Sequence, residues 1–206
     1  MRRVISAMAA TLGSMVAAVP GASAATDHQY ESWTSKAEAT FSTCVKTTPV
    51  GQHCDDWVVT ATKITDPDGS KSLLVAAQFD VEITAAGPVR KLKGSGAART
   101  TVAIDSKLAK ASAKASVSML GNCTPAGCTR SSLNVDIKWT GVGAVTTDSG
   151  GLIQLAGTCR TETSWDSTAR GATAVVKIGT ASFLSTSAQA APSLSTYHEE
   201  NGVVCK

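Results

Sequence analysis

The sequence predicts an all-β protein: a single antiparallel β-sandwich, immunoglobulin-like or related, of about eight or nine strands. Three observations lead to this prediction. Apolar and polar residues alternate over several long stretches, which is the period of a half-buried strand. Turn-forming residues separate these stretches. Six cysteines follow a leader-like N-terminus, as in exported proteins that disulfides stabilise.

Residues 1–24 carry the three parts of a secretory signal peptide. Two arginines begin it, residues 4–19 are mostly apolar, and residues 22–24 (Ala-Ser-Ala) offer the small side chains that a signal peptidase requires. We therefore expect cleavage after Ala24 and a secreted, extracellular domain over residues 25–206, with no membrane segment once the signal is removed. A retained membrane anchor is the alternative, which the short and partly polar run disfavours.

The charge of the chain argues against a nucleic-acid partner. The sequence has 19 basic and 16 acidic residues, and loss of Arg2 and Arg3 with the signal leaves 17 against 16. A net charge of +1 lacks the strongly basic face that nucleic acid requires. Seven basic residues nevertheless lie between Arg90 and Lys114, with Asp105 as the only acid among them. A solvated surface is the favoured interpretation of this basic stretch, and binding to an anionic cell-wall polymer is the alternative.

The cysteines predict three disulfides, because their number is even and the chain carries an export signal. They are Cys44, Cys54, Cys123, Cys128, Cys159 and Cys205. Spacing favours Cys123–Cys128, which closes a tight loop, and Cys44–Cys54, which brackets residues 45–53. Cys159–Cys205 then remains and would tie the C-terminus to the body of the domain. A zinc site is the competing explanation, but C-x4-C without a nearby histidine is poor zinc spacing.

Alternation locates the strands that we expect in the first half. Residues 33–41 and 73–83 each place apolar or small side chains on one face and mostly polar ones on the other. Residues 66–69 (Asp-Pro-Asp-Gly) separate 58–65, a β-branched run, from 73–83, so these two segments predict a hairpin. The same four residues begin like a calcium loop, but we favour a turn because the glutamate at the twelfth position is missing.

Residues 108–119 give conflicting signals. Their alanine and lysine content favours a helix, yet from Ala109 onward small or apolar residues alternate strictly with lysine and serine. We follow the pattern and predict one long hairpin from about 109 to 140, with Cys123–Cys128 at its tip. Residues 93–98 (Lys-Gly-Ser-Gly-Ala-Ala) are the only candidate linker and are short enough for a loop between strands. We therefore expect one domain.

Three segments of the second half occur in a recognisable order. They are an Ala-rich strand at 111–119, a V-D-x-x-W-T-G-x-G segment at 135–143 and an R-x-A-x-A strand at 170–174. In this order they resemble uncharacterised exported bacterial β-sandwich proteins, and the resemblance implies a fold without a reaction. The Cys-Thr-Pro-Ala-Gly-Cys loop at 123–128 is similar to a loop of the antibiotic-carrying apoproteins of the neocarzinostatin type. That likeness is too local for a ligand to be carried over.

Two histidines lie beside carboxylates. His53 and Asp55 are two residues apart on a predicted strand and so point to the same face, and His198 precedes Glu199 and Glu200. Either group could hold a metal or supply a catalytic base, but solvated polar side chains are the favoured interpretation. Known nucleophile and zinc motifs such as G-x-S-x-G and H-E-x-x-H do not occur. We therefore expect no catalytic residue, no metal site and no cofactor.

The tryptophans divide by their neighbours. Trp33 and Trp139 are in phase with apolar residues and are expected in the core. Trp57 and Trp165 have polar neighbours and are the candidates for exposed rings, which can stack on sugars. The predicted binding residues are His53, Asp55, Trp57 and Trp165, provided that the fold brings them to one cleft.

From these features we expect a secreted, monomeric, non-enzymatic domain that binds an extracellular ligand, a glycan or a cell-surface partner such as a cell-wall polymer. One alternative is a protease inhibitor that presents Lys46 to a trypsin-like enzyme from the loop closed by Cys44–Cys54. Another alternative is an extracellular hydrolase with an unrecognised site that uses His53 or His198.

Overall fold

The computed structural model describes residues 28–46, 51–125, 127–184 and 192–205, and over this part it contains strands and no helix. The all-β prediction is therefore confirmed. The strands are β1 (His28–Lys46), β2 (Gln52–Asp66), β3 (Gly69–Thr84), β4 (Gly87–Arg99), β5 (Val102–Ile104), β6 (Lys110–Thr124), β7 (Gly127–Ala156), β8 (Cys159–Ile178), β9 (Ala181–Leu184) and β10 (Ser193–Cys205).

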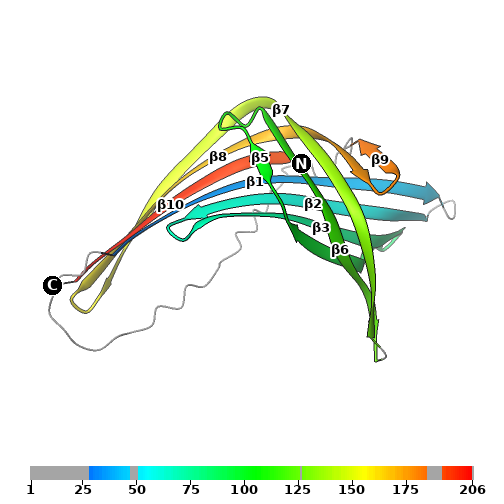
Figure 1. Ribbon diagram of the computed structural model, residues 1–206, viewed down its shortest axis with the longest axis horizontal. Helices are drawn as coiled ribbons and strands as arrows, with labels where there is room; N and C mark the ends of the chain where they lie inside the picture. Colours follow the sequence, from blue (N-terminus) through cyan, green and yellow to red (C-terminus); the bar gives the residue numbers. More distant parts are fainter. Residues whose placement is uncertain (1–27, 47–50, 126, 185–191, 206) are drawn as a thin grey trace.

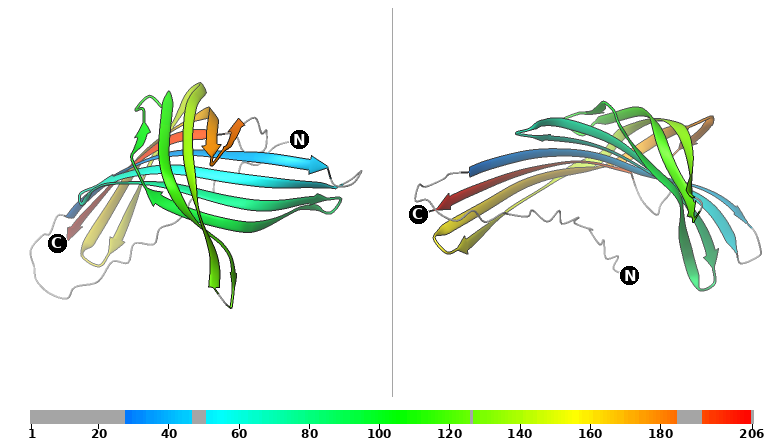
Figure 2. Two further views of the ribbon diagram at one scale, coloured as in Figure 1. Left: turned by 45° about the vertical axis from the view of Figure 1, so that its right-hand side comes forward. Right: turned by 60° about the horizontal axis from the view of Figure 1, so that its bottom comes forward.

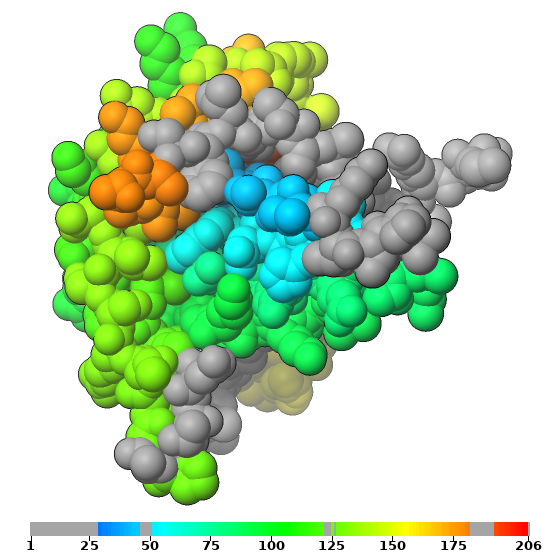
Figure 3. Space-filling model, turned by 90° about the vertical axis from the view of Figure 1, so that its right-hand side faces the viewer, coloured from blue at the N-terminus to red at the C-terminus, as the bar shows by residue number. Residues whose placement is uncertain are grey.

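The ten strands of the described residues belong to one antiparallel sheet (Figure 1). The sheet is closed, because β10 pairs with both β1 and β8. The order is β10-β1-β2-β3-β4-β6-β7-β8-β9, β5 pairs with β6, and β10 also pairs with β8. Seen from one end, residues of β1 and β2 (blue and cyan) share one surface with those of β7 and β9 (yellow-green and orange) (Figure 3). In the described residues, nine strands follow one another in the sheet, close to the expected eight or nine, and the three-residue β5 pairs with β6 beside them. The predicted sandwich is not confirmed. The reason is that hydrogen bonds link every strand into one continuous ladder.

The link between β4 and β6 joins the two halves of the sheet. Residues 94–97 of β4 pair with residues 118–121 of β6. A Cβ atom on Gly96 would lie 2.2 Å from the carbonyl oxygen of Ser118, so only glycine allows this approach. The expectation of a loop at residues 93–98 is wrong. These residues lie inside β4, and their glycines serve close strand pairing.

The hydrophobic core lies between β1–β3 on one side and β6–β8 on the other. Trp139 of β7 is 1% exposed, and its Nε1 donates a hydrogen bond of 3.1 Å to the Glu38 carbonyl of β1, which places these two strands across the core from each other. Alanines occupy many buried positions, so the two sides approach closely. These are Ala37, Ala39, Ala61, Ala76, Ala111, Ala113, Ala172 and Ala174.

Both predicted hairpins are confirmed. β2 and β3 pair along their length from Asp66 opposite Gly69, and the Asp68 amide donates to the Asp66 carboxylate at 3.0 Å within the turn. β6 pairs with β7 from residue 110 to residue 124, so the strand pattern prevails over helix propensity there. β7 then continues to Ala156, beyond the predicted end of the hairpin.

Two of the three expected disulfides are seen, Cys44–Cys54 and Cys159–Cys205. The backbone register places Cys123 opposite Cys128, but the Cys123 side chain lies outside the described residues, and this third pair stays a prediction. The expected signal peptide, residues 1–24, also lies outside them. Within the described ranges, no helix is long and apolar enough to cross a membrane.

Four strands extend beyond the core as an arm. The arm consists of residues 29–36 of β1, 145–156 of β7, 159–170 of β8 and 195–205 of β10, paired in the order β7-β8-β10-β1. The β7–β8 hairpin, the end of β10 and the start of β1 project together to one side (Figures 1 and 2). No residue of these four segments is fully buried. The arm is therefore a piece of sheet with both faces accessible.

Candidate functional site

The two faces of the arm differ in their relation to the core. On β1, Glu31 and Trp33 have the same alternation phase as the buried Ala37. On β10, His198 and Glu200 have the phase of the buried Leu194. We call this the core-side face, because farther along the same strands it lines the core.

A compact cluster of four side chains lies on the core-side face of β1 and β10. Trp33 and His198 are opposite in the strand register, and their rings stack with centroids 3.7 Å apart and planes at 11°. Trp33 Nε1 donates a hydrogen bond of 3.0 Å to Glu31 Oε1. His198 Nε2 lies 2.9 Å from that same oxygen and 3.6 Å from Glu200 Oε1. The imidazole is thus fixed between one aromatic ring and two carboxylates.

The burial of this cluster is uneven. The His198 side chain is 14% exposed, whereas the Glu31 and Glu200 side chains are 55% and 60% exposed. Asp166 of β8 is opposite His198 in the register and adds a further carboxylate to the same face. The cluster can therefore accept a cation or a hydrogen-bond donor from solvent.

A groove of about 790 Å³ continues from the cluster along the arm. Most of its lining residues have the core-side phase, among them Glu31, Glu162 and Glu200. Gly151 of β7 and Gly202 of β10 also have this phase, and nothing lies within 4 Å of where a Gly202 Cβ would be. The missing side chains leave the sheet surface bare between the carboxylates. Gly202 therefore leaves open space in the groove, whereas a Cβ on Gly151 would lie 3.3 Å from the Thr163 carbonyl oxygen.

A second cluster of polar side chains lies at the start of β2, which is the end of that strand away from the arm. His53 and Asp55 share one face of β2, where His53 Nδ1 lies 3.2 Å from Asp80 Oδ1 and Lys93 Nζ lies 2.8 Å from Asp55 Oδ1. The hydrogen bond to Asp55 raises the pKa of Lys93 above its ordinary value, although burial acts in the opposite direction. Lys93 and Asp55 form an ion pair, beside the contact between His53 and Asp80.

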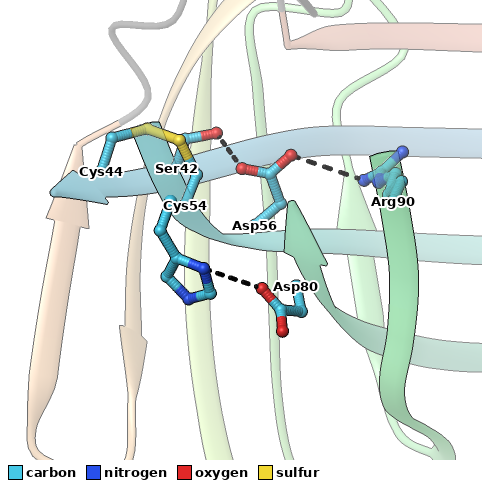
Figure 4. Close-up of a disulfide and its surroundings, with 7 residues drawn as sticks. Ser42, Cys44, Cys54, Asp56, Asp80 and Arg90 are labelled. Atoms are coloured by element: carbon cyan, nitrogen blue, oxygen red, sulfur yellow. Dashed lines mark hydrogen bonds and ion pairs between the residues drawn. A yellow bond between two sulfur atoms is a disulfide. The ribbon is translucent and has the colours of Figure 1, made fainter. Parts of the chain in front are cut away.

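The neighbouring carboxylate turns to the other face of β2. Figure 4 shows Asp56 directed toward Ser42 and Arg90 near the Cys44–Cys54 disulfide. The Ser42 hydroxyl donates to Asp56 Oδ1 at 2.5 Å, and Arg90 Nη2 lies 3.9 Å from Asp56 Oδ2. Alternation along the strand therefore separates Asp56 from the His53 group.

One tryptophan differs from expectation, and one of the two candidates for an exposed ring lies in the core. Trp139 is buried as expected, but Trp33 is 49% exposed and Trp57 is 8% exposed within the core. Trp165 is half-buried in the arm, where its ring crosses Gly150 so closely that a Cβ there would lie 2.3 Å from it. His53 is at the far end of β2 from the arm. The structure therefore does not bring the four predicted binding residues to one cleft.

The loop for the protease-inhibitor hypothesis is only partly described. The Cys44–Cys54 disulfide closes its base, but residues 47–50 and the Lys46 side chain lie outside the described residues. The inhibitor hypothesis stays a prediction, as does a hydrolase that uses His53 or His198.

The arm site contains two residues that we did not select from the sequence. His198 and Glu200 were visible as a local cluster, but Glu31 and Trp33 join it only through pairing of the first and last strands. A usable signal was that Glu31 has the phase of the apolar positions of β1 although its side chain is charged. No protein-family model, curated protein or solved structure matches the chain, so the resemblance to exported bacterial proteins stays a prediction.

Proposed function

We propose that the protein is a secreted, non-enzymatic domain that binds a glycan in the groove of its arm. The observation that carries the proposal is the groove itself, an open hollow that polar and apolar groups of the arm line in similar measure, together with Pro67 of the β2–β3 turn. Two disulfides support export, because such bonds persist in oxidising compartments.

The chemistry of the groove suits a hydroxyl-rich ligand. The carboxylates of Glu31, Glu162 and Glu200 line it, and carboxylate oxygens accept hydrogen bonds from hydroxyl groups. Trp33, on the same face beside Glu31, offers exposed aromatic surface for the apolar side of a sugar ring. Both elements of sugar recognition are therefore close together on one face.

Apolar side chains also gather on the arm. Exposed apolar groups that cluster on a surface mark a binding region more often than scattered ones do. On the core-side face, the exposed large apolar or aromatic residues of the arm are Trp33, Val145, Ile153, Leu155 and Val204, whereas Tyr30, Leu152 and Tyr197 lie on the opposite face. A ligand longer than one sugar could therefore gain contacts along the hairpin beyond the groove.

The sign of the charge narrows the class of glycan. Three carboxylates face the groove, and Arg160 beside Glu162 is the cation that pairs with one of them. A neutral or amino-bearing glycan is therefore favoured over an anionic polymer. The basic stretch that suggested an anionic polymer is partly neutralised within the sheet. Its ion pairs are Arg90–Asp56, Lys93–Asp55 and Lys114–Asp136.

Binding to an array of neutral, amino-bearing and anionic cell-wall glycans tests the proposal. Gly202→Leu fills the groove without a backbone penalty, because Gly202 is not in the left-handed region and its Cβ position is open. We expect this variant to lose binding at least tenfold. Val203→Leu is the matched control, since residue 203 lies next in sequence on the opposite face.

Two results would contradict the proposal. One is the absence of binding to every glycan of the array by the unaltered protein. The other is binding that Gly202→Leu and Val203→Leu change equally, because the groove would then not be the site.

A further inference from the structure

We propose that Glu31, His198 and Glu200 form a binding site for a divalent transition cation of the zinc type. One ligand atom from each residue lies within 4.8 Å of the other two. The site shares Glu31 and Glu200 with the proposed glycan groove, but it needs no glycan, so the metal alone can test it.

The distances within the cluster suit a tetrahedral ion. Ligand atoms bound to one zinc ion at about 2.0–2.2 Å are roughly 3.3–3.6 Å apart in tetrahedral geometry. His198 Nε2 lies 2.9 Å from Glu31 Oε1 and 3.6 Å from Glu200 Oε1. Small rotations of the two exposed carboxylates would therefore bring all three atoms around one ion.

The charges of the strand pair also point to a cation. Glu31 and Glu200 are directly opposite each other in the β1–β10 register. Like charges in such a pair destabilise a sheet, and a divalent ion between them would neutralise both. The neighbouring Asp166, opposite His198 on β8, increases the negative potential of this face.

Trp33 holds two of the three ligands in position. Its ring stacks on the His198 imidazole at 3.7 Å, and its Nε1 donates to Glu31 Oε1 at 3.0 Å. Groups that orient ligands in this way commonly change metal affinity by about 10–100-fold when they are replaced. Trp33 is therefore a positioning residue, and its indole N–H is the part to remove.

The ligand set selects the class of metal. An imidazole nitrogen suits zinc, copper, nickel and iron, whereas calcium and magnesium prefer oxygen ligands alone. Three protein ligands leave a fourth position open to the groove, as in zinc sites that also bind a small molecule. The ion would thus face the same space as the proposed glycan.

Zinc titration of the tag-free protein with intact disulfides tests the site. Isothermal calorimetry after chelator treatment should give one zinc ion per chain, and Co²⁺ should produce visible absorption bands of a tetrahedral complex. We expect Glu200→Gln and His198→Gln to weaken zinc binding at least tenfold, and Trp33→Phe to weaken it about tenfold. Thermal unfolding without metal checks that each variant folds.

Two control variants make the result specific. Glu162→Gln removes a groove carboxylate outside the cluster, and His53→Gln removes the histidine beside Asp80. Both should bind zinc within twofold of the unaltered protein. No stoichiometric uptake, equal affinity in Glu200→Gln, or loss of binding in His53→Gln would each overturn the proposal. Gly202→Leu separates the two proposals, because it should block glycan and leave zinc binding intact.

Discussion

The two described disulfides should differ in their contribution to stability, because they close loops of different length. Cys159–Cys205 joins residues 46 apart in sequence, for which the loss of unfolded-chain entropy corresponds to about 4.0 kcal/mol. Cys44–Cys54 joins residues 10 apart, which corresponds to about 2.7 kcal/mol. Both pairs join residues that are directly opposite in the strand ladder, so their removal leaves backbone pairing in place. The difference should then arise mainly in the unfolded chain.

The comparison needs substitutions that preserve packing. Cys54 is 2% exposed, so Cys44→Ser with Cys54→Val keeps an apolar side chain at the buried position. Cys159→Ser with Cys205→Ser removes the other bridge, whose cysteines are half-buried. Urea unfolding followed by circular dichroism gives both free energies. We expect the loss of Cys159–Cys205 to cost about 1 kcal/mol more, which is roughly 2–4 °C in Tm for a domain of this size. An equal or smaller loss would refute the entropic explanation.

Two further predictions concern the β4–β6 contact and the alkaline limit of stability. Gly96→Val should lower the free energy of unfolding by about 3 kcal/mol or more, because its Cβ would meet the Ser118 carbonyl. The control Ala97→Val, which is exposed and on the other face, should lower it by less than about 0.5 kcal/mol in the same urea assay. Burial and then Glu199 raise the pKa of Tyr197, as Asp55 raises that of Lys93. Both groups therefore bind their protons more tightly in the folded chain than in the unfolded chain. Their contribution to folding stability is fully present below about pH 10 and is lost as the pH rises further. Urea midpoints should fall above pH 10, and less steeply in Tyr197→Phe; an unchanged slope would contradict the assignment.

Alternation was sufficient to predict which residues form strands. The segment from Ala109 to Met119 is composed largely of good helix formers, yet it is a strand, because only a strand sorts its alanines and lysines onto separate faces. Cysteine spacing likewise predicted Cys44–Cys54 and Cys159–Cys205 correctly. The strand pattern depends on the order of neighbouring residues, and the disulfide pairing depends on elimination among six cysteines. Both can be read from one sequence.

The closure of the sheet could not be predicted from the sequence in the same way. Residues 93–98 have the composition of a loop, and nothing local reveals that Gly96 must pass close to Ser118 on another strand. Nor does any local pattern reveal that β10 pairs with both β1 and β8. Glycine is permissive in loops and necessary at close approaches, so its presence alone does not distinguish the two.

The exposure of Trp33 and the burial of Trp57 have a single physical explanation. Alternation gives the face of a strand, but burial also requires an opposing layer at that point along the strand. Trp57 has such a layer despite its acidic neighbours, and Trp33 lacks one despite its apolar phase, because it lies in the arm. A residue directly adjacent in sequence, such as Asp56 to Trp57, belongs to the opposite face and therefore reports little about the burial of its neighbour.

The same reasoning explains why the candidate site lies where it does. On β1, the positions with core phase hold Ala37 in the core and Trp33 and Glu31 in the arm. On β10, they hold Leu194 in the core and His198 and Glu200 in the arm. Paired strands thus exchange apolar for polar residues on one face at aligned positions, which is where the opposing layer ends. Residues with core phase but functional chemistry are expected at such a boundary, since the neighbouring core holds their strands rigid while solvent reaches their side chains. The cluster of Glu31, Trp33, His198 and Glu200 fulfils both conditions, and this is why we place both cation and ligand binding on the arm rather than at His53.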